Sequence, residues 1–137
     1  MTKKLLSAIL CTVLCFTMPT ILSAKAAEKN SISLRYVNVT SVSAELSFRG
    51  ENTVIAGTVK GKVGVTQISA ETRLQRKDRS GWVSVESWSG TSYNDYMSIS
   101  ESTTVAKGYT YRVRLDVTAY AGGKSESITQ YSKEVSH

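Results

Sequence analysis

Two tryptophans and three arginines are the residues of this chain whose types suit recognition chemistry. Trp82 and Trp88 lie in one predicted strand, while Arg73, Arg112 and Arg114 stand at alternate polar positions of two others. An exposed aromatic ring beside a guanidinium suits a sugar ring, an anionic polymer or a protein partner. We therefore expect any ligand face to include these five side chains, provided that their strands lie side by side.

The strand predicted over residues 82–88 determines where the two tryptophans point. Val83 and Val85 share one parity and both tryptophans share the other, so both tryptophans lie on the outer face if the valines face the core. The alternative is that a tryptophan beside a hairpin turn folds over the rim of the core, because large aromatic side chains bury most of their area. We favour that alternative for Trp82 and leave both orientations open for Trp88.

Patterns for catalysis and metal binding are missing from the sequence. Nucleophilic catalysis needs a positioned base, yet the one histidine is the final residue, His137. No glycine-rich phosphate loop, histidine-rich metal pattern or calcium loop is present. The 11 acidic residues are scattered and fall mostly on outward strand positions. This distribution is typical of a solvated surface and does not indicate the pair of catalytic carboxylates that a glycosidase uses. We expect no enzyme, no catalytic residue, no cofactor and no metal site.

The elements that must position the tryptophans and arginines are β-strands. Beyond residue 26, β-branched and aromatic residues alternate with polar ones, and no segment has apolar residues at helical spacing. The predicted strands cover 32–36, 42–48, 53–60, 67–76, 82–88, 96–100, 109–120 and 125–131, the first of them optional. Turn signals such as Gly122-Gly123 separate the seven main strands, each of which has one apolar face. The pattern predicts an all-β domain, an antiparallel two-sheet β-sandwich.

The first 26 residues predict a signal peptide helix. Two lysines precede an apolar run over residues 5–16, and Ala24-Lys25-Ala26 supplies small residues for signal peptidase, so we expect cleavage after Ala26. The apolar run is shorter than the ~20 residues of a membrane span, and Pro19 interrupts the stretch, so we expect no membrane anchor after cleavage. The mature β-sandwich domain is then residues 27–137.

Removal of residues 1–26 changes the charge and the cysteine content. It takes away three lysines and no acidic residue, so the formal net charge falls from +6 to +3. The remaining charges are interspersed, whereas a nucleic-acid binder has a clustered basic stripe. Both cysteines, Cys11 and Cys15, are removed, and neither follows the small residue that lipid attachment needs. We expect a mature domain without disulfides, lipid or nucleic acid.

From Leu74 onward the chain resembles fibronectin type III and immunoglobulin-like domains. Residues 74–85 resemble the hairpin between the third and fourth strands of a type III domain. Residues 105–113 resemble its turn into the sixth strand, with Lys107 in place of the usual proline. Tyr111 stands where such domains have a corner tyrosine, whose hydroxyl bonds back to the preceding turn. The resemblance implies that the strands carrying the five side chains above are neighbours.

A closer resemblance is to a family of small secreted proteins from Gram-positive bacteria, defined by a domain of unknown function. Its members combine a signal peptide with an LQ-K/R-rich turn before G-x-W, a V-x-S-W ending and a K-G-x-x-Y-R-V strand. Residues 74–82, 85–88 and 107–113 carry these motifs here. The motifs are structural, so the resemblance implies secretion and fold and transfers no site residue.

These features favour a secreted protein that is free or loosely associated with the cell wall. The leading hypothesis is an extracellular binding or adhesion module at the cell envelope, with a cell-wall polymer, a carbohydrate or another secreted protein as its partner. One alternative is a secreted bacteriocin-like or toxin-associated effector, favoured by small size and mild positive charge. A structural matrix component is the other.

Overall fold

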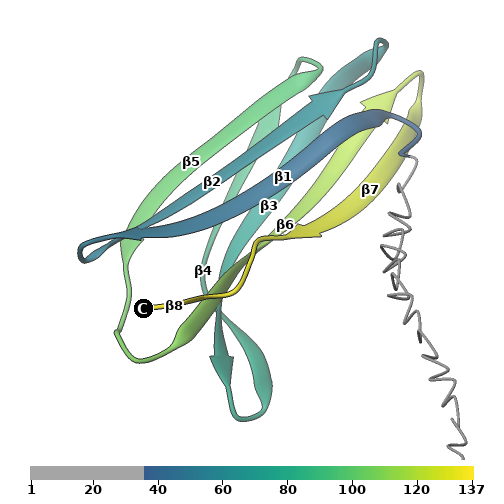
Figure 1. Cartoon of the computed structure of the whole chain (residues 1–137). Coiled ribbons are helices and arrows are strands. Elements are labelled where there is room, and N and C mark those ends of the chain that lie inside the picture. Colours follow the sequence, from purple (N-terminus) through teal and green to yellow (C-terminus); the bar gives the residue numbers. More distant parts are fainter. Residues whose placement is uncertain (1–35) are drawn as a thin grey trace, which may run out of the picture. The chain divides into compact units, whose positions relative to one another are not determined.

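The computed structural model describes residues 36–137, which form eight β-strands and no helix (Figure 1). The strands are β1 (Val39–Arg49), β2 (Asn52–Gly61), β3 (Val65–Asp78), β4 (Gly81–Ser92), β5 (Tyr96–Thr104), β6 (Thr110–Ala121), β7 (Lys124–Tyr131) and β8 (Val135–Ser136). The signal peptide predicted over 1–26 and nearly all of the optional strand over 32–36 lie outside the described residues. Residues 36–137 hold no helix long and apolar enough to cross a membrane.

The strands form two antiparallel sheets that enclose one core. The smaller sheet has the order β1-β2-β5, and the larger has the order β4-β3-β6-β7 with the short β8 paired to β6. Figure 1 shows the two layers, and buried residues of both sheets meet between them. The predicted all-β architecture with two antiparallel sheets is confirmed. The observed β4 continues to Ser92, four residues beyond its predicted end.

Alternation along β6 shows why these residues form strands. Its inward side chains are buried from Tyr111 to Ala119, and the side chains between them face outward. The buried set is Tyr111, Val113, Leu115, Val117 and Ala119. Residues of β2 and β3 follow the same rule, so that apolar side chains from both sheets share one interior. Burial of this apolar surface is the main favourable contribution to the stability of the domain.

Tyr111 joins the two sheets near one end of the core. Its hydroxyl donates a hydrogen bond to the backbone oxygen of Ala106 at 2.7 Å, which is the bond to the preceding turn expected from the sequence. Its ring packs edge-on against Phe48 of β1. Burial raises the pKa of Tyr111 above its ordinary value, because the phenolate would lose its hydration.

The hairpin between β6 and β7 closes through two glycines, as predicted. Ala121 pairs with Lys124, so Gly122 and Gly123 alone form the loop. Both have positive φ angles, 55° and 76°, which a two-residue hairpin turn of this kind requires. The tight turn sets the register between β6 and β7 and thereby aligns their outward side chains.

Strand β4 contains a bulge that changes its side-chain alternation. Leu74 of β3 lies opposite Glu86, but the following residue, Gln75, lies opposite Ser84. Val85 is therefore an extra residue in β4, a β-bulge. Without the bulge, Trp82 and Trp88 would point to the same face of the sheet. With it, residues of equal parity on the two sides of Val85 point to opposite faces.

The bulge places the two tryptophans on opposite faces of the larger sheet. Trp82 pairs with Lys77 on the outer face, whereas Trp88 pairs with a buried position of β3. Val83 shares the inward parity of Arg76 and Tyr111 but is 43% exposed, and the bulge residue Val85 is 46% exposed, so neither valine is buried in the core as the sequence reading assumed. The sequence left the orientation of Trp88 open, and the structure turns it toward the core, so its assignment to the ligand face is corrected. The rim placement favoured for Trp82 is also wrong, because Trp82 lies on the outer face.

Candidate functional site

The outer face of the larger sheet carries the outward side chains of β4, β3, β6 and β7 in cross-strand rows. The pairing registers place Arg73 beside Arg114, and Arg114 beside Tyr131. Arg112 lies in the next row and contacts Trp82. We call Arg73, Trp82, Arg112, Arg114 and Tyr131 the arginine stack. The structure thus brings together four of the five side chains singled out in the sequence, and Trp88 is not among them.

Carboxylates neutralise two arginines of the stack. Arg73 donates through Nε to Glu71 Oε1 at 2.9 Å and through Nη1 to Asp116 Oδ2 at 3.0 Å. Arg114 donates through Nε and Nη2 to Asp116 Oδ1, both at 3.1 Å. The hydrogen bond to Asp116 raises the pKa of Arg114 above its ordinary value. Because two carboxylates balance two guanidiniums, these arginines offer little unpaired charge to an anion.

The third arginine, Arg112, lies between two aromatic rings. Its guanidinium carbon is 4.1 Å from the ring centroid of Trp82 and 4.3 Å from that of Tyr131. Its Nε donates to Oε1 of Gln75 at 3.0 Å, and Gln75 is buried. Cation–π contacts with the two rings stabilise the guanidinium. Arg112 therefore covers one face of Trp82 and reduces the aromatic surface open to a ligand.

Trp88 lies on the other face of β4, toward the core. It packs against a buried cluster that includes Ile55, Leu74 and Tyr111. Together with Met97 of β5 it lines a cavity of about 360 Å³ between the edges of the two sheets. Trp88 is consequently part of the packing that supports the larger sheet, and a ligand on the outer face does not reach it.

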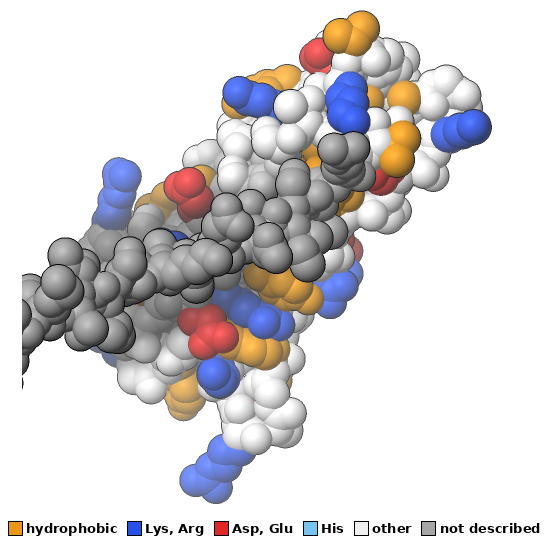
Figure 2. All heavy atoms as spheres, turned by 45° about the vertical axis from the view of Figure 1, so that its right-hand side comes forward, with side chains coloured by type: hydrophobic (Ala, Val, Ile, Leu, Met, Phe, Trp, Pro, Cys, Tyr) orange, Lys and Arg blue, Asp and Glu red, His pale blue; other side chains and the backbone are white. Residues whose placement is uncertain are grey.

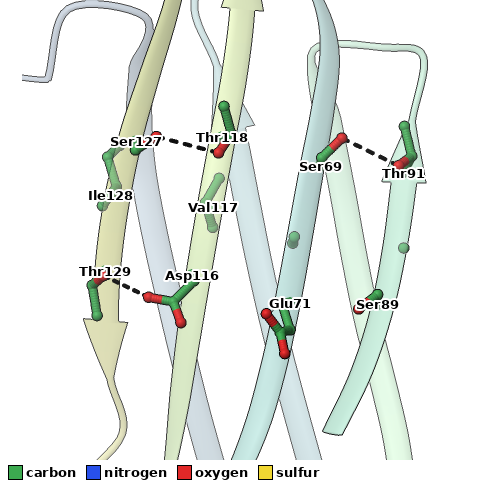
Figure 3. Close-up of a pocket in the computed structure, with 12 residues that line it drawn as sticks. Ser69, Glu71, Ser89, Thr91, Asp116, Val117, Thr118, Ser127, Ile128 and Thr129 are labelled. Atoms are coloured by element: carbon green, nitrogen blue, oxygen red, sulfur yellow. Dashed lines mark hydrogen bonds between the residues drawn. The ribbon is translucent and has the colours of Figure 1, made fainter.

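Further along the same strands, the outer face of the larger sheet is hollowed. We call this region the polar hollow. Its volume is about 570 Å³, and short polar side chains line it (Figure 3). The polar residues are Ser69, Glu71, Ser89, Thr91, Asp116, Thr118, Ser127 and Thr129. Because these side chains are short and Gly90 has none, they leave open the space that long side chains fill in the arginine stack.

The polar groups of the hollow form two rows across four strands. In the first row, Ser69 shares a hydrogen bond with Thr91 at 3.2 Å, and Thr118 shares one with Ser127 at 3.3 Å. Thr129, in the second row, donates to Oδ1 of Asp116 at 2.6 Å, and Asp116 lies opposite Glu71. Figure 3 shows both rows running across β7, β6, β3 and β4. The hollow thus presents an ordered array of hydroxyl and carboxylate groups.

The chemistry of this array suits binding better than catalysis. The carboxylates of Glu71 and Asp116 are held by arginines, so they serve as hydrogen-bond acceptors and are poorly placed to exchange protons with a substrate. Residues 36–137 contain no group of three or more His, Cys, Asp or Glu side chains that could hold a metal ion. His137 stacks on Phe48, with ring centroids 4.1 Å apart, and does not line the hollow.

No sequence pattern singles out the residues of the polar hollow. Alternation placed Ser69, Glu71, Asp116 and Thr118 at outward positions, and all four line the outer face. Serine and threonine are common at such positions, so their types carried no signal. The signal lies in the cross-strand register, which brings short side chains of four strands into adjacent rows.

Charged side chains are dispersed over the surface. Figure 2 shows one face on which basic, acidic and hydrophobic side chains are interspersed. Several cations are also paired, such as Lys77 with Glu134 at 3.3 Å and Arg76 with Asp78 at 2.9 Å. A ligand on the outer face of the larger sheet therefore meets local hydrogen-bonding groups more than a strong field of one sign.

No protein-family model and no curated protein matches this chain. Among solved structures, it is similar to the solution structure of CsgH from R. palustris, with a TM-score of 0.41 and 14% sequence identity over 65% of this chain and 88% of that chain. A second similar structure is Spo0M, a sporulation control protein from Bacillus subtilis. Its TM-score is 0.41 and its identity 15%, over 71% of this chain and 49% of that chain.

A third similar structure is OgpA from Akkermansia muciniphila. Its TM-score is 0.35 and its identity 13%, over 70% of this chain and 28% of that chain. The chain thus spans about half of Spo0M and less than a third of OgpA. Likenesses at this level carry no inference about function, which has to come from the residues of the outer face.

Proposed function

We propose that this protein is a secreted binding module that attaches to the cell envelope through the outer face of its larger sheet. In this proposal residues 1–26 are the signal peptide, and the mature domain begins at Ala27. The basic start, the apolar run and the small residues before Ala27 support export. Membership of the Gram-positive secreted family that the sequence resembles belongs to the same proposal.

The proposal also assigns the sandwich to the fibronectin type III-like class. Its support is the strand order, β1-β2-β5 against β4-β3-β6-β7. Further support is the hydrogen bond from Tyr111 to the backbone of Ala106, which has the character of a tyrosine corner. In such a scaffold the paired strands hold outward side chains in constant relative positions, as a binding site requires.

The observation that carries the proposal is the polar hollow. Its groups come from four neighbouring strands, are hydrogen-bonded to one another and border about 570 Å³ of open space. This volume lies within the usual range of small-ligand sites. A site that is already ordered also loses little conformational entropy when a ligand binds. A binding role fits these properties, and we propose no catalytic activity.

Retention on isolated cell walls of the producing strain tests the proposal. Thr118→Phe places a neutral ring in the hollow while keeping a residue that favours β-strands. Thr58→Phe is the matched control, because Thr58 lies on the outer face of the smaller sheet and is also hydrogen-bonded to a serine, Ser43, at 2.6 Å. We expect Thr118→Phe to sediment poorly with the walls and Thr58→Phe to sediment like the wild type.

Urea unfolding of both variants establishes that each is folded before retention is compared. The proposal is overturned if the wild-type protein does not sediment with the walls. It is also overturned if folded Thr118→Phe sediments as well as the wild type, because the hollow would then take no part in attachment.

A further inference from the structure

We propose that the polar hollow binds a neutral, hydroxyl-rich glycan chain. This inference deepens the proposed function and rests on it, since it names the chemical class of the ligand for the same face. It follows from three properties of the described residues: the hydroxyl row, the paired carboxylates and two tyrosines that border the hollow on the outer face.

The hydroxyl row matches the hydrogen-bonding pattern of sugars. Thr91, Ser69, Thr118 and Ser127 occupy successive positions on β4, β3, β6 and β7. Neighbouring strands are about 4.8 Å apart, so the row extends over roughly 14 Å. Each hydroxyl donates one hydrogen bond and accepts others, as sugar hydroxyls do, so the row can exchange its internal hydrogen bonds for bonds to a ligand.

The carboxylates at the second row favour a neutral ligand over an anion. Glu71 and Asp116 contribute oxygens that accept hydrogen bonds from sugar hydroxyls and have no hydrogen bond to donate to a phosphate or carboxylate group. The described residues that line the hollow include no Lys or Arg. The nearest arginines, Arg73 and Arg114, already donate to these two carboxylates. A polyanion would therefore find no unpaired cation among the residues that line the hollow.

Two exposed tyrosines stand at the outward positions next to the hollow, one at each end, and Arg112 of the arginine stack lies over the ring of Tyr131. Tyr120 is the next outward residue of β6 after Thr118 and is 39% exposed. Tyr131 is the next outward residue of β7 after Thr129 and is 41% exposed. Aromatic rings beside a few placed polar groups are the usual composition of a small-ligand site, and their faces suit the apolar C–H surface of a sugar ring. The two tyrosines are placed so that one chain of sugars could contact both.

Titration with defined saccharides tests this inference. The protein, ¹⁵N-labelled and purified in the form that its producing strain accumulates, is titrated with β-1,4-linked hexamers of glucose and of N-acetylglucosamine, and separately with poly(glycerol phosphate). We expect at least one neutral hexamer to shift the backbone amide signals of Thr118, Tyr120 and Ser127. Poly(glycerol phosphate) should leave these three signals in place.

Two variants and a matched control sharpen the test. Thr118→Val with Ser127→Ala removes a hydroxyl pair of the hollow and should weaken glycan binding roughly tenfold. Tyr120→Ala should weaken it as well, by removing one ring. Thr58→Val with Ser43→Ala removes the equivalent hydroxyl pair from the smaller sheet and should leave the affinity unchanged.

The inference is overturned if neither hexamer shifts these signals, or if poly(glycerol phosphate) shifts them in place of the hexamers. It is also overturned if the control pair weakens binding as much as the pair in the hollow. Wall retention separates this failure from failure of the proposed function. If Thr118→Phe abolishes wall retention while neutral glycans do not bind, the hollow is still the surface that attaches to the wall, and only the proposed class of ligand is wrong.

Discussion

The polar hollow and the arginine stack occupy the same strands of one sheet and differ in the length of their side chains. In the stack, long side chains lie over the sheet and contact one another, as Arg112 contacts the rings of Trp82 and Tyr131. In the hollow, hydroxyls reach only their immediate neighbours and leave open space. The side chains with the strongest recognition chemistry are therefore largely engaged within the protein, whereas the short ones leave room for a ligand.

This difference implies a division between stability and binding. Contacts in the arginine stack, and the tryptophan packed behind the sheet, should contribute to the free energy of unfolding. The hydroxyls of the polar hollow should contribute little to it, because their hydrogen bonds are exposed and are replaced by water when they are lost.

The largest effect is expected at Trp88. Trp88→Ala should lower the free energy of unfolding by about 3 kcal/mol, because the ring packs against a buried cluster. Trp82→Ala is the matched control on the same strand and should cost about 1 kcal/mol, since that ring contacts Arg112 on the outer face. Urea unfolding measures both, and equal losses would contradict the opposite placement of the two rings.

Arg112→Ala should have the next largest effect, a loss of about 2 kcal/mol. It removes two cation–π contacts and leaves the buried side chain of Gln75 without its donor. Arg112→Lys should recover only part of the loss, because an ammonium keeps the charge but lacks the planar stacking of a guanidinium. If Arg112→Ala unfolds at the same urea concentration as the wild type, the stack does not stabilise the sheet.

Tyr111 should make the stability sensitive to alkaline pH. Its folded-state pKa is raised above the ordinary value of 10.0, so its contribution is complete below that pH and is lost as the pH rises toward the raised value. Tyr111→Phe should cost about 1 kcal/mol at neutral pH through the lost hydrogen bond to Ala106. It should also reduce the alkaline loss of stability relative to the wild type. Urea unfolding at neutral and alkaline pH checks both statements, and an unchanged alkaline loss would show that Tyr111 is not its source.

The smallest effect is expected in the polar hollow. Thr118→Val with Ser127→Ala removes both partners of one hydrogen bond and should change the free energy of unfolding by less than about 0.5 kcal/mol. The same should hold for Thr58→Val with Ser43→Ala on the smaller sheet. A loss above about 1 kcal/mol in Thr118→Val with Ser127→Ala, but not in the control pair, would show that the hydroxyl row stabilises the fold. The distinction between a stabilising arginine stack and a binding hollow would then be lost.

Local pattern accounts for the parts of the fold that were predicted correctly. The alternation in β6 identified its buried side, the Gly122-Gly123 pair identified a two-residue hairpin, and Tyr111 was assigned its bond to the preceding turn. The candidate site was predicted less well, because Trp88 was grouped with the arginines. A bulge at Val85 leaves no mark in the residue types of β4, so alternation alone could not reveal it.

The sequence by itself determined that residues 36–137 form strands and which side chains of most strands point inward, because these properties depend on the period of two within each strand. The tertiary structure alone determined which outward side chains become neighbours. That outcome depends on the register between strands distant in the chain, such as β3 with β6. The register between β3 and β6 brings Arg73 to Asp116. The bulge at Val85 separates Trp82 from Trp88, and the registers of all four strands together align the hydroxyls of the polar hollow.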